Sequence, residues 1–181
     1  MDSRYTDLTN EIKAAEAAAA GSKEAFCELY GKYRDRLYRY ALYRLGDPSD
    51  AEDAVSECVL AAWLGLPGLR KPEAFGSWIF RILHACCAKR IKDSVRLREN
   101  MQRIYTEGGS GPSDGCSSPA SLSVELTEAL AQLDEEERSI VLLSVLGGLT
   151  SREISEITSL TPGAVRSKLS RSLAKMREYL S

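Results

Sequence analysis

The sequence predicts an all-α protein made of two small helical domains joined by a flexible linker. Apolar residues recur at helical spacing through most of the chain, and glycine and proline stand at the ends of these periodic runs. One internal stretch, Glu107 to Ser121, consists mostly of glycine, serine and proline and resists regular structure. The predicted domains therefore cover residues 1–95 and 122–181, with the linker at 96–121.

Four helices are expected before the linker, because capping residues and helix breakers divide this part of the chain into four periodic runs. Serine and aspartate are favoured at helix N-caps, proline in the first turn, and glycine just past the C-terminus. The expected start and stop signals, in chain order, are Thr6 and Gly21, Ser22 and Gly46, Asp47-Pro48, and Glu73.

The third of these helices is predicted to have two chemically different sides. Small and apolar residues recur along one side at the spacing of a buried stripe. The opposite side carries Asp50, Asp53, Ser56 and Glu57. Acidic residues on one side of a rigid helix indicate a face that docks on another protein.

The fourth helix combines aromatic residues with positive charge. It begins near Glu73 and becomes basic toward Lys92. An aromatic ring beside a basic groove can stack on an unpaired base, which makes Trp78 a candidate for contact with nucleic acid. Its helical spacing with Phe75 and Ile79 favours a packing role instead.

The last thirty-odd residues predict a helix-turn-helix. Thr150 and Glu153 stand three apart, as in a capping box that starts a short helix, and Thr161-Pro162 starts a second one. The polar side of that second helix is predicted to contact DNA, because arginine and hydroxyl groups reach guanine edges and phosphate oxygens. Its candidate contact residues are Arg166, Ser167, Lys168, Ser170 and Arg171. The buried side is expected to carry Val165, Leu169, Leu173 or Ser172, Met176 and Leu180.

Composition argues against an enzyme and against a metal protein. The chain of 181 residues holds one histidine and five cysteines. It has no C-x-x-C pair, no nucleophile paired with a base and no glycine-rich phosphate loop, so we predict no catalytic residue and no cofactor. His84, Cys86 and Cys87 would point in divergent directions on a helix, so we predict no metal site.

The net charge and the N-terminal sequence indicate which partners the protein can bind and where in the cell it acts. The formal net charge of −2 is unexpected for a protein that binds DNA unaided. The chain lacks an apolar run long enough for a membrane span, and its N-terminal stretch lacks the pattern of a signal peptide. We therefore expect a cytoplasmic protein with no membrane contact of its own.

In combination, these motifs resemble the extracytoplasmic-function (ECF) class of bacterial RNA polymerase sigma factors, in the sigma-70 superfamily. The order and spacing of the motifs over nearly the whole chain carry the resemblance. They are Gly21 to Phe26, Leu29-Tyr30, Tyr33, Leu45 to Asp47, Asp50 to Val55, Trp63, Phe75 and Trp78 to Ile82 in the first half. In the second half they are Ala129-Leu130, Leu133, Arg138, Val141-Leu142, Leu149-Thr150, Glu153-Ile154 and Gly163 to Leu169.

The resemblance implies a promoter-specificity subunit of RNA polymerase, with a sigma region 2 domain before the linker and a sigma region 4 domain after it. The side chains of Asp50, Asp53, Ser56 and Glu57 would bind the clamp helices of the polymerase largest subunit. The helix that would capture and melt the downstream, −10, element carries Trp78, Arg81, His84, Lys89 and Arg90. The helix-turn-helix would read the upstream, −35, element and meet the polymerase flap. An anti-sigma factor is an expected further partner.

The turn of the helix-turn-helix departs from the family pattern at Ser159, where glycine is customary. Serine in a left-handed turn conformation costs on the order of 1 kcal/mol relative to glycine. The fold is expected to tolerate it. An alternative interpretation remains open: a stand-alone helix-turn-helix regulator whose N-terminal domain dimerises or senses a signal.

Overall fold

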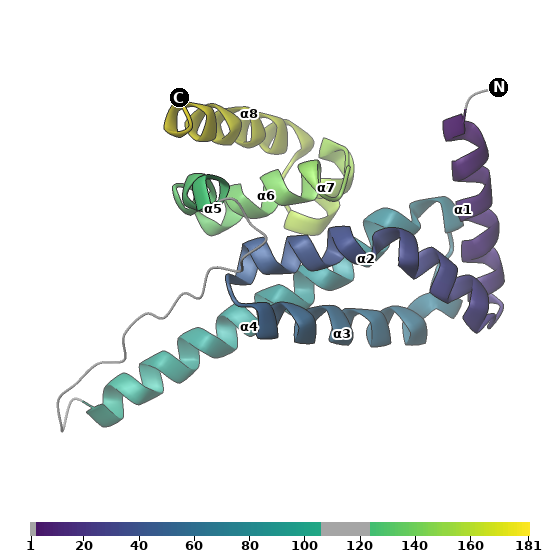
Figure 1. Cartoon of the computed structure of the whole chain (residues 1–181), viewed down its shortest axis with the longest axis horizontal. Helices are drawn as coiled ribbons and strands as arrows, with labels where there is room; N and C mark the ends of the chain where they lie inside the picture. The colour runs from purple at the N-terminus through teal and green to yellow at the C-terminus, as the bar shows by residue number, and fades with distance from the viewer. Residues whose placement is uncertain (1–2, 106–123) are drawn as a thin grey trace.

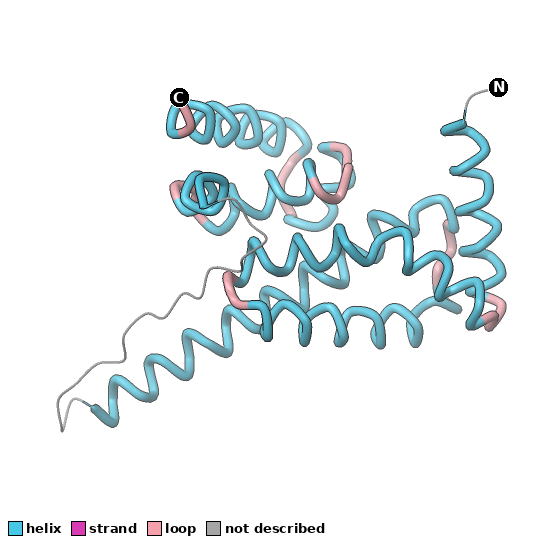
Figure 2. The backbone as a smooth tube through the Cα atoms, in the orientation of Figure 1, coloured by secondary structure: helices cyan, strands magenta, loops and turns pink. Residues whose placement is uncertain are grey.

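The computed structural model describes residues 3–105 and 124–181, and every regular element in these ranges is helical. The helices of the first range are α1 (Ser3–Ala19), α2 (Lys23–Leu45), α3 (Pro48–Gly65) and α4 (Phe75–Tyr105), with short 3-10 turns at Leu66–Gly68 and Pro72–Ala74. Those of the second range are α5 (Val124–Ala131), α6 (Glu135–Val145), α7 (Ser151–Thr158) and α8 (Pro162–Tyr179). Figure 2 shows that only short loops join helices within each range. The all-α prediction is confirmed.

Two of the four predicted helix starts in the N-terminal domain, Ser22 and Asp47, coincide with caps, whereas α1 begins at Ser3 and α4 at Phe75. The Ser22 hydroxyl accepts a hydrogen bond from the Ala25 amide at 3.2 Å, and the Asp47 carboxylate accepts one from the Asp50 amide at 2.9 Å. Gly46 ends α2 in the left-handed conformation, with φ of 76°. These contacts satisfy amides and carbonyls that a helix end leaves unpaired, so local sequence is enough to position them.

The N-terminal domain packs α2, α3 and α4 around an aromatic core, and α1 crosses one end of this bundle (Figure 1). The Tyr33 and Phe75 ring centroids lie 5.4 Å apart and those of Tyr40 and Phe80 lie 5.8 Å apart, both in edge-to-face geometry. Such pairs add a preferred orientation to the burial of large apolar surfaces. The core therefore fixes α4 against α2.

Helix α4 differs from the prediction at its C-terminal end. It continues to Tyr105, so residues 96–105, which we assigned to the linker, are helical. Glycine is absent between Gly76 and Gly108, and good helix formers occupy most positions, so nothing local ends the helix earlier. Figure 1 shows this end of α4 projecting beyond the rest of the bundle. The glycine- and serine-rich stretch from Glu107 to Ser121, including Cys116, lies outside the described residues.

The C-terminal domain packs α6, α7 and α8 around a small aliphatic core, with α5 against α8. Ile140, Leu143, Ile154 and Val165 are fully buried. The predicted inner side of α8 needs correction at two positions: Leu173 is 38 % exposed and Leu180 is 51 % exposed. Ser172, the alternative to Leu173, is the buried residue, and its hydroxyl donates to the Lys168 carbonyl at 2.8 Å, so no polar group is left unpaired by the burial.

The two domains contact each other through α2 and α4 on one side and α6 and α7 on the other. Figure 1 shows the C-terminal helices stacked over α2, with α8 farthest from the N-terminal domain. Within the described ranges, no helix is both long and apolar enough to cross a membrane.

Candidate nucleic-acid interface

The helix-turn-helix is held by reciprocal caps. The Thr150 amide donates to the Glu153 carboxylate at 2.8 Å, while the Glu153 amide donates to the Thr150 hydroxyl at 3.3 Å. The Thr161 hydroxyl accepts from the Ala164 amide at 3.2 Å at the start of α8. Between the two helices Ser159 adopts the left-handed conformation, with φ of 61°. The predicted capping box and the predicted strained serine are both confirmed.

The outer side of α8 faces solvent. Four of the five predicted contact residues are exposed there: Arg166, Ser167, Ser170 and Arg171. The fifth, Lys168, is partly covered, because its ammonium forms an ion pair with Glu136 of α6. The hydrogen bond that its ammonium donates to that carboxylate raises the pKa of Lys168. α8 thus offers two arginines and two hydroxyls on one open face, with Lys168 bound to α6 beside it.

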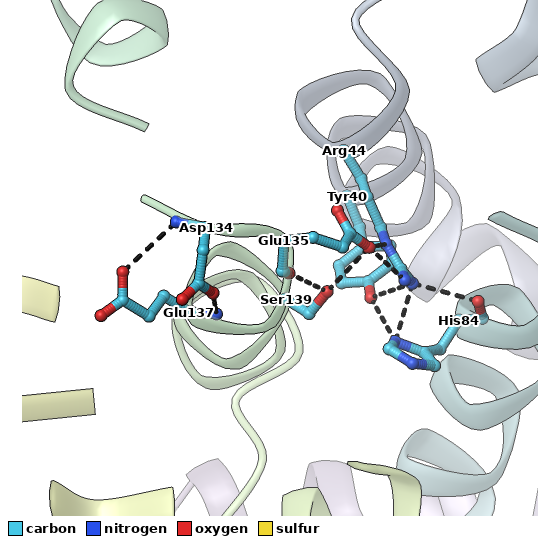
Figure 3. A network of polar contacts seen from close by, with 7 residues as sticks. All are labelled: Tyr40, Arg44, His84, Asp134, Glu135, Glu137 and Ser139. Atoms are coloured by element: carbon cyan, nitrogen blue, oxygen red, sulfur yellow. Dashed lines mark hydrogen bonds and ion pairs between the residues drawn. The ribbon is translucent and has the colours of Figure 1, made fainter. Parts of the chain in front are cut away.

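Three consecutive glutamates open α6, and each binds a different cation. Glu135 pairs with Arg44 of α2 at 2.6 Å, Glu136 pairs with Lys168, and Glu137 pairs with Lys175 of α8 at 2.7 Å. Glu137 also completes a capping box with Asp134, as Figure 3 shows. Sequence reasoning missed these roles, because a run of acids before an apolar helix is equally consistent with a solvated first turn.

Trp78 lies in α4 as a packing residue. Its ring is 5.8 Å from that of Phe75, and it is partly buried against Gly65, where an added Cβ would approach the indole to 3.3 Å. The packing interpretation is therefore correct for the indole as a whole. A nucleic-acid base could contact only the part of the Trp78 indole that remains exposed.

Arg81 and His84, two more predicted strand contacts, already have partners. Arg81 pairs with Glu156 of α7 at 2.9 Å, and both side chains are largely exposed. His84 Nδ1 lies 2.7 Å from a guanidinium nitrogen of Arg44 and 2.9 Å from the Tyr40 hydroxyl. Burial, with Arg44 adding to it, lowers the pKa of His84 to about 4, so the imidazole is neutral at pH 7.

Arg90 is held against the acidic side of α3, and the exposed Lys89 reaches the same side. The Arg90 guanidinium contacts Asp50 at 3.1 Å, Asp53 at 3.4 Å and Glu57 at 3.0 Å, whereas Lys89 reaches Glu57 at 3.9 Å. The predicted downstream-element cations and the predicted docking acids are therefore partners within one domain. The spacing of residues within α3 or within α4 cannot show that side chains of the two helices pair with each other.

The outer side of α3 combines charge with exposed apolar groups. Asp50, Asp53, Ser56 and Glu57 all lie near the surface, as predicted. One and two turns beyond Glu57, Leu60 is 60 % exposed and Leu64 is 70 % exposed. Large apolar residues on an open helix face are typical of a protein interface. Sequence reasoning missed both leucines, although their offset from the buried stripe was readable.

Two of the cysteines, Cys58 and Cys87, are packing groups of the core. Cys58 and Cys87 are fully buried, and burial raises the pKa of the Cys87 thiol to about 12. Burial also raises the pKa of Cys58. A thiol held protonated is a poor nucleophile and a poor metal ligand. In residues 3–105 and 124–181 no group of His, Cys, Asp and Glu could hold a metal ion.

Comparison with known families matches both domains. Residues 29–97 match sigma-70 region 2, and residues 123–176 match sigma-70 region 4. The ECF RNA polymerase sigma factor BldN of Streptomyces coelicolor is 29 % identical over 97 % of this chain and 67 % of its own length. The ECF RNA polymerase sigma factor SigW of Bacillus subtilis is 24 % identical over 93 % of this chain and 95 % of its own.

Solved structures share the fold. CnrH in complex with the cytosolic domain of CnrY aligns with a TM-score of 0.68 at 23 % identity, over 94 % of this chain and 97 % of that one. The sigma factor RpoE in complex with the anti-sigma factor NepR from Bartonella quintana aligns with a TM-score of 0.70 at 19 % identity, over 86 % of this chain and 96 % of that one.

Proposed function

Because this chain belongs to the ECF class of sigma-70 factors, which direct RNA polymerase to promoters, we propose a division of labour among its helices. Helix α3 docks on the clamp helices of the polymerase largest subunit. Helix α8 reads the upstream, −35, element, while the opposite side of its domain meets the flap. Helix α4 captures the downstream, −10, element during DNA opening. The single observation that best supports this proposal is the presence of separate acidic-apolar and basic-polar helix faces on α3 and α8.

The docking role of α3 is supported by its mixed surface. Leu60 and Leu64 supply apolar area that a partner can bury, and Asp53 and Glu57 beside them supply negative charge for a basic partner. Apolar contact provides affinity at an interface, while charge selects the partner and speeds association. The proposed docking face therefore comprises Asp50, Asp53, Ser56, Glu57, Leu60 and Leu64.

The reading role of α8 is supported by four exposed side chains. Arg166 and Arg171 can each bond a guanine edge or a phosphate, and Ser167 and Ser170 lie between them on the same face. Lys168, bound to Glu136, fits better as a group that fixes α8 on α6.

The partners extend this proposal to regulation and location. CnrH and RpoE were solved with CnrY and the anti-sigma factor NepR, respectively, and an anti-sigma factor is proposed for this chain on that likeness. We also propose that the protein acts in the cytoplasm, where RNA polymerase works. The stand-alone regulator interpretation lacks support, because a stand-alone regulator has no use for region 2.

Transcription with purified core polymerase on fragmented genomic DNA tests the proposal. We expect start sites that appear only when the protein is added. Asp53→Lys/Glu57→Lys should abolish retention of core enzyme in a pull-down, whereas Glu16→Lys/Glu28→Lys, which changes the same charge at exposed sites outside the face, should retain it. The proposal fails if no start site depends on the protein, or if both double variants retain polymerase equally.

A further inference from the structure

The cations of α8 fall into two groups, according to whether the first turn of α6 binds them. Lys168 pairs with Glu136, and Lys175 pairs with Glu137 at 2.7 Å. The arginines of α8 are Arg166, Arg171 and Arg177. Within the described residues no ion pair to any of these arginines is found. The lysines of α8 are therefore neutralised inside the C-terminal domain, whereas its arginines are not.

The two lysines lie on the same side of α8. Lys168 and Lys175 stand seven positions apart, which is about two helical turns. Helices α6 and α8 pack against each other, and both carboxylate partners belong to the first turn of α6. The two ion pairs thus bind one side of α8 to α6 at two points.

The second of these points is rigid, because a capping box fixes Glu137. Its carboxylate accepts from the Asp134 amide at 3.3 Å, and its own amide donates to the Asp134 carboxylate at 2.7 Å, as Figure 3 shows. The Glu137 side chain is only 12 % exposed, and the Lys175 ammonium lies 2.7 and 2.9 Å from its two oxygens. Lys175 therefore holds this side of α8 on α6.

The first point joins Lys168 to Glu136, two turns closer to the start of α8. The Lys168 side chain is 28 % exposed and that of Glu136 is 44 % exposed. The hydrogen bond to Glu136 raises the pKa of Lys168, so its ammonium stays charged while it is paired. Because Lys175 holds the same side of α8, Lys168 stays within reach of Glu136.

The arginines of the reading face are held differently. Arg171 donates through Nε to the Ser167 carbonyl at 3.3 Å, a contact that aligns its side chain along α8 and adds no negative charge. The two terminal nitrogens of a guanidinium bound in this way can still donate to a guanine edge or a phosphate. Arg166 is exposed on the same face.

We propose that Glu136 keeps Lys168 from the DNA backbone, so that arginines rather than this lysine provide the positive charge with which α8 binds the upstream element. The inference rests on the proposed reading role of α8. A Lys168 that moved to a phosphate would leave the Glu136 carboxylate unpaired beside a row of negative charges, and this repulsion opposes the exchange. Glu136 therefore limits the sequence-independent part of DNA affinity, which depends on how many phosphates the protein neutralises.

The salt dependence of DNA binding by holoenzyme tests the role of Glu136. Each added phosphate contact makes the slope of log affinity against log salt more negative by about 0.9. Core polymerase contributes the same contacts in every variant, so differences in slope belong to this chain. We expect Glu136→Gln, which frees Lys168, to add one contact. Its gain in affinity for a mapped promoter fragment should then be about three- to fourfold larger at about 50 mM salt than at about 200 mM.

Two further variants control for charge and trace the effect to Lys168. Glu125→Gln removes the same charge from an exposed position of α5 and should keep the slope of wild type. Glu136→Gln/Lys168→Gln should also keep it, because the second change removes the cation that the first one frees. The gain in Glu136→Gln should be equal on a fragment with a scrambled upstream element, since phosphate contacts carry no sequence information. A gain confined to the intact promoter would overturn the phosphate assignment.

Two other results would overturn the role of Glu136. One is an equal slope in Glu136→Gln and Glu125→Gln. The other is a slope about 0.9 less negative in Lys168→Gln than in wild type, because this lysine would then already contact a phosphate. Glutamine has the size and shape of glutamate, and circular dichroism establishes that the variants are folded.

The reading role of α8 is tested separately in the same assay. Unchanged affinity of Arg166→Ala/Arg171→Ala would contradict that role. A loss of affinity in this arginine variant, together with no effect of Glu136→Gln, would reject only the role of Glu136.

Discussion

The two predicted DNA-binding helices present their positive charge in opposite ways. On α8, Arg166 and Arg171 are exposed, and within the described residues no ion pair to either is found. On α4, Arg81 and Arg90 each contact at least one carboxylate, and His84 is tied to Arg44. A basic stretch of sequence is therefore not yet a basic surface, because acids from another helix can neutralise it. If both helices bind DNA as proposed, α8 can do so with its arginines as they stand, whereas Arg81 and Arg90 of α4 would first have to give up their carboxylate partners.

The largest expected effect comes from removing the free charges of α8. Arg166→Ala/Arg171→Ala should weaken binding to the upstream element at least tenfold, because each lost base contact costs about 1 to 3 kcal/mol. Electrophoretic mobility shift of holoenzyme on a mapped promoter measures this. Lys13→Ala/Lys23→Ala, at exposed cations of the N-terminal domain, is the matched control. Equal affinity of the two double variants would contradict the reading role of α8.

Acid should destabilise the α4 side through His84. The pKa of this imidazole is about 4 when folded and 6.5 in the reference state, so its folded form binds protons less readily. Above pH 6.5 the imidazole does not reduce the free energy of unfolding. As pH falls from 6.5 toward 4 the unfolded chain takes up a proton that the folded protein does not, and the free energy of unfolding has dropped by about 2 kcal/mol at pH 5. The groups in contact with the imidazole are Tyr40 and Arg44 of α2, and Arg44 in turn pairs with Glu135 of α6.

Urea unfolding at pH 7.5 and pH 5 measures this effect. The loss between the two pH values should shrink in His84→Gln, which cannot take up a proton. Tyr40 is buried, so its raised pKa keeps its hydroxyl neutral over this range, and the Arg44 guanidinium stays charged. An identical pH dependence in wild type and variant would show that His84 is solvated in the folded protein.

A smaller effect is expected at the turn that orients α8. Ser159 holds φ of 61°, where a side chain is strained and glycine is not. Ser159→Gly should raise the midpoint of thermal unfolding and stabilise the C-terminal domain by up to about 1 kcal/mol, reduced by the greater freedom of glycine in the unfolded chain. Ser155→Gly, in the middle of α7, is the contrasting variant and should destabilise. A stabilised Ser155→Gly would mean that helix propensity does not govern α7.

The smallest effect on stability is expected at Lys89. Its ion pair with Glu57 is 3.9 Å long and both side chains are well exposed, so Lys89→Ala should change the free energy of unfolding by less than about 0.5 kcal/mol. Promoter opening, followed by permanganate reactivity of unpaired thymines, should nevertheless fall if this lysine contacts the strand. Unchanged opening would leave Lys89 as a solvated cation and remove it from the predicted strand contacts.

The local features of this chain could be predicted from sequence because their causes lie within a few residues. Ser22, Asp47 and Thr161 bond amides three positions ahead, and the capping box needs only Thr150 and Glu153. Helical periodicity likewise separated the buried stripe of α3 from its exposed acids. The all-α class, the helix-turn-helix and the family followed from signals of this kind, and all are confirmed.

What only the tertiary structure decided is which charges meet. Arg44 and Glu135 stand far apart in the chain, as do Arg81 and Glu156, and no spacing rule connects them. The exposure of Leu173 also depended on what packs nearby, because helical periodicity alone does not show which positions of α8 a neighbouring helix covers. The sequence by itself determined the sigma factor family and two helices that are predicted to contact DNA. Long-range pairing of buried and exposed charge determined that one of those helices is free and the other is occupied.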